Sequence, residues 1–270
     1  MPTVDRELLR RALDELYERY NNRDFVHPDP LEFLYAYDNV RAREIAGLVA
    51  SSLAYGRVQQ ILKSVALVLD AMGDPVDFVA NATKGQMSSA FAGFRHRFTT
   101  GEEIARMLWG ARGMIRRCGS LEAGLAEGMR GEAGNVLPAL ARFAAELSGE
   151  CRACGSLVAS PADGSACKRM NLFLRWMVRR DAVDPGGWDS IPASKLVVPL
   201  DTHMFRIAGA LGFTMRKSAD LKAAVEITEA FREFAPEDPV KYDFALTRLG
   251  IRRDDDTGHF FETLGITETA

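Results

Sequence analysis

The sequence predicts an all-α protein, and three observations carry that prediction. Apolar residues recur with the spacing of amphipathic helices along most of the 270 residues. Glycine and proline interrupt this pattern at intervals that suit helix ends. The single strand-like run, "KLVVPL" (195–200), contains Pro199, which cannot donate a hydrogen bond inside a sheet.

The apolar spacing places the helices in order along the chain. Residues 5–20 carry apolar side chains from Leu8 to Leu16 on one face, at helical intervals. Gly56 separates two apolar helices, and a basic helix follows between two loops that are rich in glycine and proline. The remaining helices are expected at 41–54, 57–72, 101–117, 119–129, 135–148, 166–180, 202–210, 217–234 and 239–249.

The composition is typical of a globular protein in water, with 47% hydrophobic and 26% charged residues. No apolar run approaches the ~20 residues that a membrane-spanning helix needs. The charged N-terminal stretch lacks the apolar core of a signal peptide, so we expect a cytoplasmic location and no membrane partner. Four cysteines in a chain of this length do not suggest a disulfide framework.

Positive charge gathers in two stretches although the net charge of the chain is −3. Residues 95–117 hold six arginines against two glutamates, and residues 168–180 hold five basic side chains and no acid. Residues 218–270 carry twelve acids against six bases. Such a bipolar distribution suits a protein that binds a polyanion on one side. Arginines on solvated helix faces explain the same pattern, so charge alone leaves both interpretations open.

The basic helix contains the first candidate for chemistry. Lys168, Arg175 and Arg179 are separated by seven and four residues and therefore share one face. Ser165 is the expected N-cap, which places Lys168 in the first helical turn. The positive end of the helix dipole and the neighbouring Arg169 both disfavour an ammonium there and favour the free, nucleophilic amine. A solvated lysine is the alternative.

Asp201 is the second candidate. The apolar run "LVVPL" delivers it to the start of a helix that is expected to end near Gly212. As the N-cap, its carboxylate can accept hydrogen bonds from the amides of His203 or Met204, which keeps it ionised and in place. A fixed carboxylate beside a neutral amine suits a reaction through a sugar cation, because it stabilises the positive charge that the amine attacks. The alternative is that Asp201 only caps the helix.

Several segments carry a family resemblance. "VVPLDTHMFRIAGALGF" resembles the region around the catalytic aspartate of the helix-hairpin-helix DNA glycosylases, with the match running from Val198 to Phe213. "REIAGLVASSLAYGRVQQILKSV" (43–65) is similar to the paired helices whose connecting turn reaches towards the DNA. "FRHRFTTGEEIARML", "GSACKRMNLFLRWMVRR" and "EDPVKYDFALTRLGIR" are similar to a bacterial family of unassigned function that is related to those glycosylases. The chain is identified as a member of that family, and the weaker similarity covers most of residues 30–250.

The resemblance implies a two-lobed, helix-hairpin-helix glycosylase-like bundle. A barrel-like lobe over 41–180 would carry the basic helix, and 1–40 together with 181–270 would form the second lobe, with a cleft between them. The hairpin is divergent, because "SPADGSACKR" stands where the family has its apolar-Pro-Gly turn.

The resemblance also implies roles for the two candidates. Lysine-using members of the best-known branch carry their lysine closer to the aspartate, where this chain has Ala182-Val183. Lys168 lies 33 residues before Asp201, a spacing similar to that of the archaeal 8-oxoguanine DNA glycosylase branch. Lys195, six residues before Asp201, is the competing lysine.

Further residues are candidate DNA contacts. Tyr55, Gly56 and Arg57 form the turn that resembles the DNA-facing one, and Tyr and Arg suit the filling of a duplex where a base leaves. Asp243 lies in a segment similar to the helix that closes the base pocket in the archaeal branch. His203 follows the Asp-Thr pair and can reach the substrate. A core role for Tyr55, a surface acid at Asp243 and a packing role for His203 are the alternatives.

The cysteines form at most a weak metal pattern. Cys151 and Cys154 are one close pair, while Cys118 and Cys167 stand alone, and a strong zinc site has two close pairs. The iron–sulfur glycosylases place four cysteines after the aspartate, and none follows Cys167 here. We therefore expect no metal.

The expected function is a DNA glycosylase with AP lyase activity that excises an oxidised purine such as 8-oxoguanine from double-stranded DNA. Lys168 attacks C1′ and forms a Schiff base, Asp201 stabilises the charge on the sugar, and Arg175 and Arg179 contact phosphates. No cofactor and no obligate protein partner are expected, and the location is the cytoplasm at the nucleoid. A monofunctional glycosylase with Asp201-activated water, and a non-catalytic protein that binds nucleic-acid structures on the same fold, are the alternatives.

Overall fold

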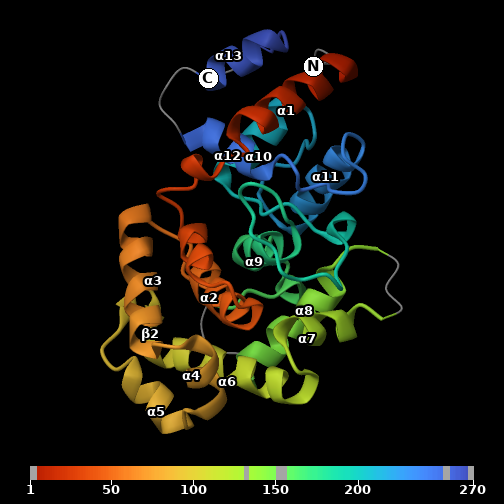
Figure 1. Cartoon of the computed structure of the whole chain (residues 1–270). Helices are drawn as coiled ribbons and strands as arrows, with labels where there is room; N and C mark the ends of the chain where they lie inside the picture. Colours follow the sequence, from red (N-terminus) through yellow and green to blue (C-terminus); the bar gives the residue numbers. More distant parts are fainter. Residues whose placement is uncertain (1–4, 131–133, 150–156, 252–255, 267–270) are drawn as a thin grey trace.

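Helices form most of the chain in the computed structural model, which confirms the all-α class (Figure 1). The structure describes residues 5–130, 134–149, 157–251 and 256–266. Its α-helices are α1 (Arg6–Tyr20), α2 (Val40–Ser52), α3 (Val58–Met72), α4 (Pro75–Asn81), α5 (Lys84–Ala90), α6 (Gly101–Cys118), α7 (Leu121–Gly128), α8 (Leu137–Ser148), α9 (Lys168–Val178), α10 (Thr202–Ala210), α11 (Leu221–Arg232), α12 (Asp243–Ile251) and α13 (Asp256–Thr263). The shorter elements are the 3-10 helices η1 (Arg23–Phe25), η2 (Pro30–Ala36), η3 (Pro161–Asp163) and η4 (Ala193–Lys195), and the strands β1 (Arg95–His96) and β2 (Thr99–Thr100).

The first and last helices lie together at one end of the molecule (Figure 1). The face of α1 that carries Leu9 and Leu13 is buried, as its apolar spacing predicts, and α1 packs against α12. Asp14 of α1 accepts hydrogen bonds from Nζ of Lys241 and from the hydroxyl of Tyr242, both at 2.8 Å. These bonds fix the segment that leads into α12.

Helix α9 lies near the centre of the molecule and packs along α2 (Figure 1). The two helices meet at Gly47 of α2, where a Cβ would lie in van der Waals contact with Cε2 of Phe173 (3.4 Å) and Sδ of Met177 (3.5 Å). The ring of Phe173 also meets Trp188 edge to face, with 5.1 Å between the ring centres. Because this apolar face is fixed, the opposite, polar face of α9 has a fixed direction as well.

A small hairpin at residues 95–100 was not expected from the sequence. Arg95 pairs with Thr100 and His96 pairs with Thr99 in antiparallel fashion. The strand-like run 195–200 forms no strand, because the amide of Val198 donates to Oγ1 of Thr228 (3.0 Å) in place of a neighbouring strand. The hairpin is too short to show an alternating pattern, so its sequence gives little sign of it.

Helices α4, α5 and α13 were also not expected. Asp74 caps α4 by accepting from the amide of Asp77 (2.8 Å), and Pro75 follows at the first helical position. Thr83 and Gln86 form a reciprocal capping box at the start of α5. The start signals were therefore present, but helices of seven residues are too short to reveal an apolar period.

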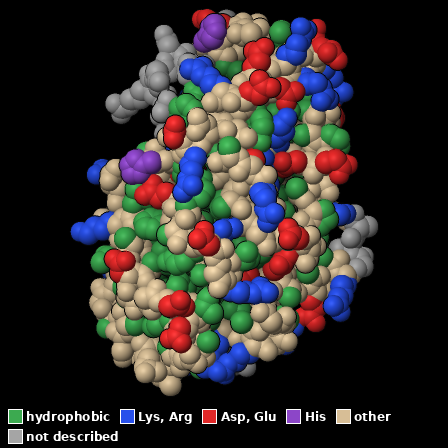
Figure 2. All heavy atoms as spheres, viewed as in Figure 1, with side chains coloured by type: hydrophobic (Ala, Val, Ile, Leu, Met, Phe, Trp, Pro, Cys, Tyr) green, Lys and Arg blue, Asp and Glu red, His purple; other side chains and the backbone are tan. Residues whose placement is uncertain are grey.

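Charged side chains of both signs mix on the surface. On the face seen in Figure 2, Lys and Arg lie among Asp and Glu, with hydrophobic side chains between them. Within the described ranges, no helix combines the length and the apolar character needed to cross a bilayer. The division into two lobes stays a prediction.

Candidate active site

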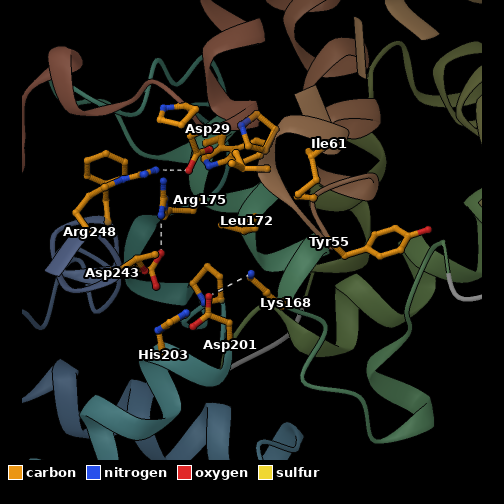
Figure 3. A pocket seen from close by; sticks show the side chains of 18 of the residues that line it. Asp29, Tyr55, Ile61, Lys168, Leu172, Arg175, Asp201, His203, Asp243 and Arg248 are labelled. Atoms are coloured by element: carbon orange, nitrogen blue, oxygen red, sulfur yellow. Dashed lines mark hydrogen bonds and ion pairs between the residues drawn. The ribbon is translucent and has the colours of Figure 1, made fainter. Parts of the chain in front are cut away.

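A pocket of about 440 Å³ brings together residues from five separate segments. They are the segment 25–30, the turn and helix start at 54–61, α9 from Lys168 to Trp176, the segment 199–203 and α12 from Asp243 to Arg248. Lys168 and Asp201 both line this pocket, and in Figure 3 their side chains point towards one another. The two candidates that the sequence singled out therefore converge on one cavity.

Asp201 holds the position that the sequence predicts. It is the N-cap of α10, and its Oδ1 accepts a hydrogen bond from the amide of Met204 at 2.8 Å. The side chain is 13% exposed. The preceding apolar run is buried from Leu196 to Val198 and at Leu200, while Pro199 lines the pocket. The buried run fixes the backbone before Asp201, and the bond to Met204 fixes its side chain. Together they hold the carboxylate at the pocket.

Lys168 is the first residue of α9, and its Nζ lies 3.2 Å from Oδ2 of Asp201. Ser165 is not the N-cap: that place is taken by Cys167 in the left-handed conformation (φ 49°), whose amide donates to Oγ of Ser165 (3.2 Å). The Lys168 side chain remains 38% exposed and also lines an adjoining pocket of about 530 Å³. Lys195 lies in η4, outside the residues that line either cavity.

Arg175 and Arg179 are buried and do not form the exposed basic face that the expected phosphate contacts need, although Arg175 lines the pocket. Their exposed fractions are 3% and 5%. Arg175 pairs with Oδ1 of Asp184 (3.1 Å) and with Oδ2 of Asp243 (2.5 Å). Arg179 pairs with Asp184 and with Oδ2 of Asp181 (2.8 Å). The physical reason is that these acids, which lie later in the chain, fold over the same face of α9 and neutralise it.

These side chains form a buried ion-pair network, which Asp238 completes through a contact of 2.9 Å with Nε of Arg179. Burial raises the pKa of the Asp184 carboxyl, although both arginines oppose that effect. Asp181 is also partly enclosed, but Arg179 and the amides of Asp184 and Val183 hold its pKa below the usual range. The arginines and acids of the network therefore neutralise one another inside the protein, while Oδ1 of Asp243 stays without a hydrogen-bond partner.

Asp243 connects the network to the pocket. It is 3% exposed, and burial raises its pKa to about 6, while Arg175 opposes the rise and the charges of Asp201 and Asp184 add to it. Its Oδ2 pairs with Arg175, whereas its Oδ1 is buried without a hydrogen-bond partner. Asp243 also lines the pocket, although this oxygen is itself shielded from solvent.

Tyr55 does not have the free side chain that a duplex-filling role needs. Its hydroxyl donates to the carbonyl oxygen of His96 and lies equally close to Oγ1 of Thr99, at 2.8 Å in each case. In Figure 3 its ring points away from Lys168 and Asp201.

The other two residues of that turn stay accessible. Gly56 lines the pocket and is exposed, with φ 100°. Arg57 is exposed and stands at the N-cap of α3 without a side-chain cap bond.

His203 lines the pocket from the first turn of α10. It packs against Gly250 of α12, where a Cβ would lie 3.3 Å from Cβ of His203. The side chain therefore has both an accessible edge and a packing role. Its expected contact with substrate stays a prediction.

Three pocket residues were missed from the sequence. Arg248 pairs with Asp29 across the pocket, and its Nε is buried without a partner (Figure 3). Trp176 is buried and is one of the residues that line the pocket, and its Nε1 is also unpaired. Two features of the sequence could have indicated these residues. Asp29-Pro30 is a helix start signal, and Arg248 follows Asp243 by about one and a half helical turns.

The structure describes two of the four cysteines on which the metal prediction rests. Cys118 and Cys167 are free thiols, and burial raises the pKa of Cys167 to about 11. Cys151 and Cys154 lie outside the described residues. Within the described ranges, no group of three or more His, Cys, Asp or Glu could hold a metal ion.

Comparison with known proteins gives one match. Curated proteins and solved structures each contain no match to this chain. A family model described as "Protein of unknown function (DUF2400)" matches residues 29–252. This range contains all the residues that line the pocket except Phe25, His27 and Pro28. The match covers most of the sequence, and the chain therefore belongs to the DUF2400 family.

Proposed function

We propose that the chain is a DNA glycosylase with AP lyase activity, acting on an oxidised purine such as 8-oxoguanine in double-stranded DNA. The observation that carries the proposal is the 3.2 Å approach of Lys168 Nζ to Asp201 Oδ2 at the wall of a pocket of about 440 Å³. A base must leave the helix to reach such a cavity. There the amine and the carboxylate can act on the same sugar carbon, one as nucleophile and one as charge stabiliser.

The chemical step uses these two side chains, the substrate and water. The Lys168 ammonium first releases a proton to water, and the free amine bonds to C1′ while the bond between C1′ and the base nitrogen breaks, so that the electron pair of that bond stays with the departing base. The proton that the lysine nitrogen then loses neutralises the base. Asp201 stabilises the positive charge that develops on the sugar between these events. The adduct then opens to a Schiff base, loss of a C2′ proton expels the 3′ phosphate, and water hydrolyses the imine.

Three residues that line the pocket carry a buried polar atom without a partner, and this supports a nucleobase as the occupant. Nε1 of Trp176 and Nε of Arg248 are donors without acceptors, and Oδ1 of Asp243 is an acceptor without a donor. Unpaired buried groups are unfavourable until a ligand satisfies them. The rim of 8-oxoguanine carries two carbonyl oxygens and several N–H groups, so it supplies both kinds of partner. The cavity volume also falls in the range of small-molecule sites.

The relation to the helix-hairpin-helix glycosylases is part of the proposal. Its support is the segment from Val198 to Phe213, which has Asp201 as the N-cap of α10, facing a lysine. A two-lobed arrangement with a divergent hairpin and association with the nucleoid in the cytoplasm follow from the same proposal.

Borohydride trapping tests the proposal directly. The protein is incubated with a duplex that contains 8-oxoguanine, and borohydride reduces any Schiff base to a stable protein–DNA adduct. We expect an adduct with the wild type and none with Lys168→Ala. Lys195→Ala is the matched control, because Lys195 lies outside the residues that line the pocket, and it should still be trapped.

Each other result has a distinct meaning. Loss of trapping in Lys195→Ala together with normal trapping in Lys168→Ala moves the nucleophile to Lys195 and contradicts the assignment. Base release without an adduct supports a monofunctional glycosylase in which Asp201 activates water. Tight binding of the duplex with neither release nor adduct, for 8-oxoguanine and other oxidised bases, supports a non-catalytic binder and refutes the enzyme.

A further inference from the structure

The hairpin of β1 and β2 holds an aromatic side chain in solvent between basic ones. Phe98 is 77% exposed, and Arg95 and Arg97 on the same hairpin are also exposed. Arg97 has φ 52°, a conformation that residues other than glycine rarely adopt. The guanidinium carbon of Arg97 lies 5.6 Å from the ring centre of Phe98, and such an exposed pair adds little to the stability of the fold. Their combination at one tip points to a ligand.

The root of the hairpin is held firmly. The carbonyl oxygen of His96 and Oγ1 of Thr99 both lie 2.8 Å from the hydroxyl of Tyr55. The ring of His96 is 1% exposed and spans two further partners, the carbonyl oxygen of Tyr55 and Oγ of Ser64, at 2.9 Å each. Burial lowers the pKa of this imidazole and the nearby Arg97 and Arg169 lower it further, while the bond to the carbonyl oxygen of Tyr55 opposes this shift. The exposed tip therefore stands on a rigid base.

The hairpin also borders the pocket. Gly56, which lines the cavity, lies under the side chain of Arg97: a Cβ at position 56 would be 3.0 Å from Cδ of Arg97. On the other side of this turn, the guanidinium carbon of Arg169 lies 4.9 Å from the ring centre of Tyr55. Arg169 directly follows Lys168 in α9. The turn at residues 55–57 therefore lies between Arg97 of the hairpin and Arg169, the residue after Lys168 in α9.

We propose that this hairpin enters the DNA duplex beside the pocket, with Phe98 stacked on the bases where the target base has left. Arg95 and Arg97 meet the phosphates on either side of the opening. The inference rests on the proposed function, and it gives Phe98 the duplex-filling role that the sequence suggested for Tyr55. Aromatic side chains stack on any base, and the flanking arginines match the charge of the backbone, so the tip suits DNA of any sequence.

The test uses a duplex that cannot react. It contains a tetrahydrofuran abasic analogue opposite 2-aminopurine, whose fluorescence reports stacking. We expect the wild type to bind and to change this fluorescence. Phe98→Ala should bind roughly 5- to 150-fold more weakly, the range for losing one base–aromatic stack, and should lose the fluorescence change. Phe98→Tyr should keep both, because it keeps the ring.

Leu67→Ala is the control variant. Leu67 is 52% exposed on α3 and lines neither pocket, so its truncation should change neither affinity nor fluorescence. Equal affinity and fluorescence for the wild type and Phe98→Ala overturn the inference, as does a wild type that does not bind the duplex. Since the analogue has no base to release, a clear Phe98 effect together with neither base release nor borohydride trapping would refute the enzyme and retain the hairpin as a DNA-binding element.

Discussion

The two ends of α9 carry charge clusters of opposite character. Near its start, Lys168 meets the single carboxylate of Asp201, and these side chains are 38% and 13% exposed. About two turns later, Arg175 is 4% exposed and shares Asp184, which is fully buried, with Arg179. The basic run 168–180 thus supplies a partly exposed ion pair at the pocket, through Lys168, and a buried ion-pair network, through Arg175 and Arg179.

This difference separates residues that can react from residues that hold the fold. An exposed ion pair adds about 0–1 kcal/mol of stability, so stability alone gives little reason to place Lys168 beside Asp201. A buried cation, in contrast, needs all of its partners, because removal of one leaves an uncompensated charge. Four experiments test this division, taken from the largest expected effect to the smallest.

Removing one acid of the network should destabilise the protein most. Asp184→Asn keeps the shape of the side chain but leaves Arg175 and Arg179 short of a shared buried partner. We expect a loss of about 3–5 kcal/mol in the free energy of unfolding, measured by chemical denaturation. Asp189→Asn is the control, since the Asp189 side chain is 86% exposed. A loss below about 1 kcal/mol at Asp184 would show that the network is not structural.

Asp201→Asn should affect the reaction and not the fold. Asparagine caps a helix about as well as aspartate, so the melting temperature should change little. Loss of a well-placed charge stabiliser costs about 3–4 kcal/mol of barrier, so single-turnover excision should fall by roughly 10²–10³-fold. Asp74→Asn removes the charge from another N-cap, that of α4, and should excise at the wild-type rate. A normal excision rate in Asp201→Asn contradicts the catalytic role.

Asp243 should make stability depend on pH in a defined window. Its folded-state pKa of about 6 lies above the ordinary value of 3.8, so the folded state holds the proton more tightly than the unfolded state. Stability from this group is therefore present below about pH 4 and is lost as pH rises to about 6. Relative to Asp243→Asn, the wild type should lose on the order of 1–3 kcal/mol over this range. Parallel stability curves for the two proteins would contradict the raised pKa.

Lys168→Gln should have the smallest effect on stability. The lost ion pair is partly exposed, so the free energy of unfolding should fall by no more than about 1 kcal/mol, while borohydride trapping disappears. Denaturation curves of the two proteins at equal ionic strength give the comparison. A loss above about 2 kcal/mol would place Lys168 with Arg175 among the structural charges.

The helical class and the position of Asp201 could be predicted because both depend on local sequence. Apolar spacing specifies long helices, and an aspartate after a buried run is a strong cap signal, so its bond to Met204 was foreseeable. The pairing of Lys168 with Asp201 followed from the family resemblance and not from spacing alone.

The burial of Arg175 and Arg179 could not be predicted in this way. Their acidic partners lie up to 68 residues away, and only the packing of α12 brings Asp243 to them. Phe98 was overlooked for a related reason, because a two-residue turn in a short hairpin carries no periodic signal. For Arg175 the decisive partner is distant in the chain, and for Phe98 the element is too short to carry a pattern.

The contact between α1 and α12 bears on the order in which a ribosome makes this protein. Asp14 emerges early, but its partners Lys241 and Tyr242 are synthesised 227 and 228 residues later. Contacts of such long separation form late in folding. A nascent chain that has already released Lys168 and Asp201 therefore lacks the wall that α12 gives the pocket. The completed cavity, and any activity that depends on it, can arise only after the last segment of α12 has left the ribosome.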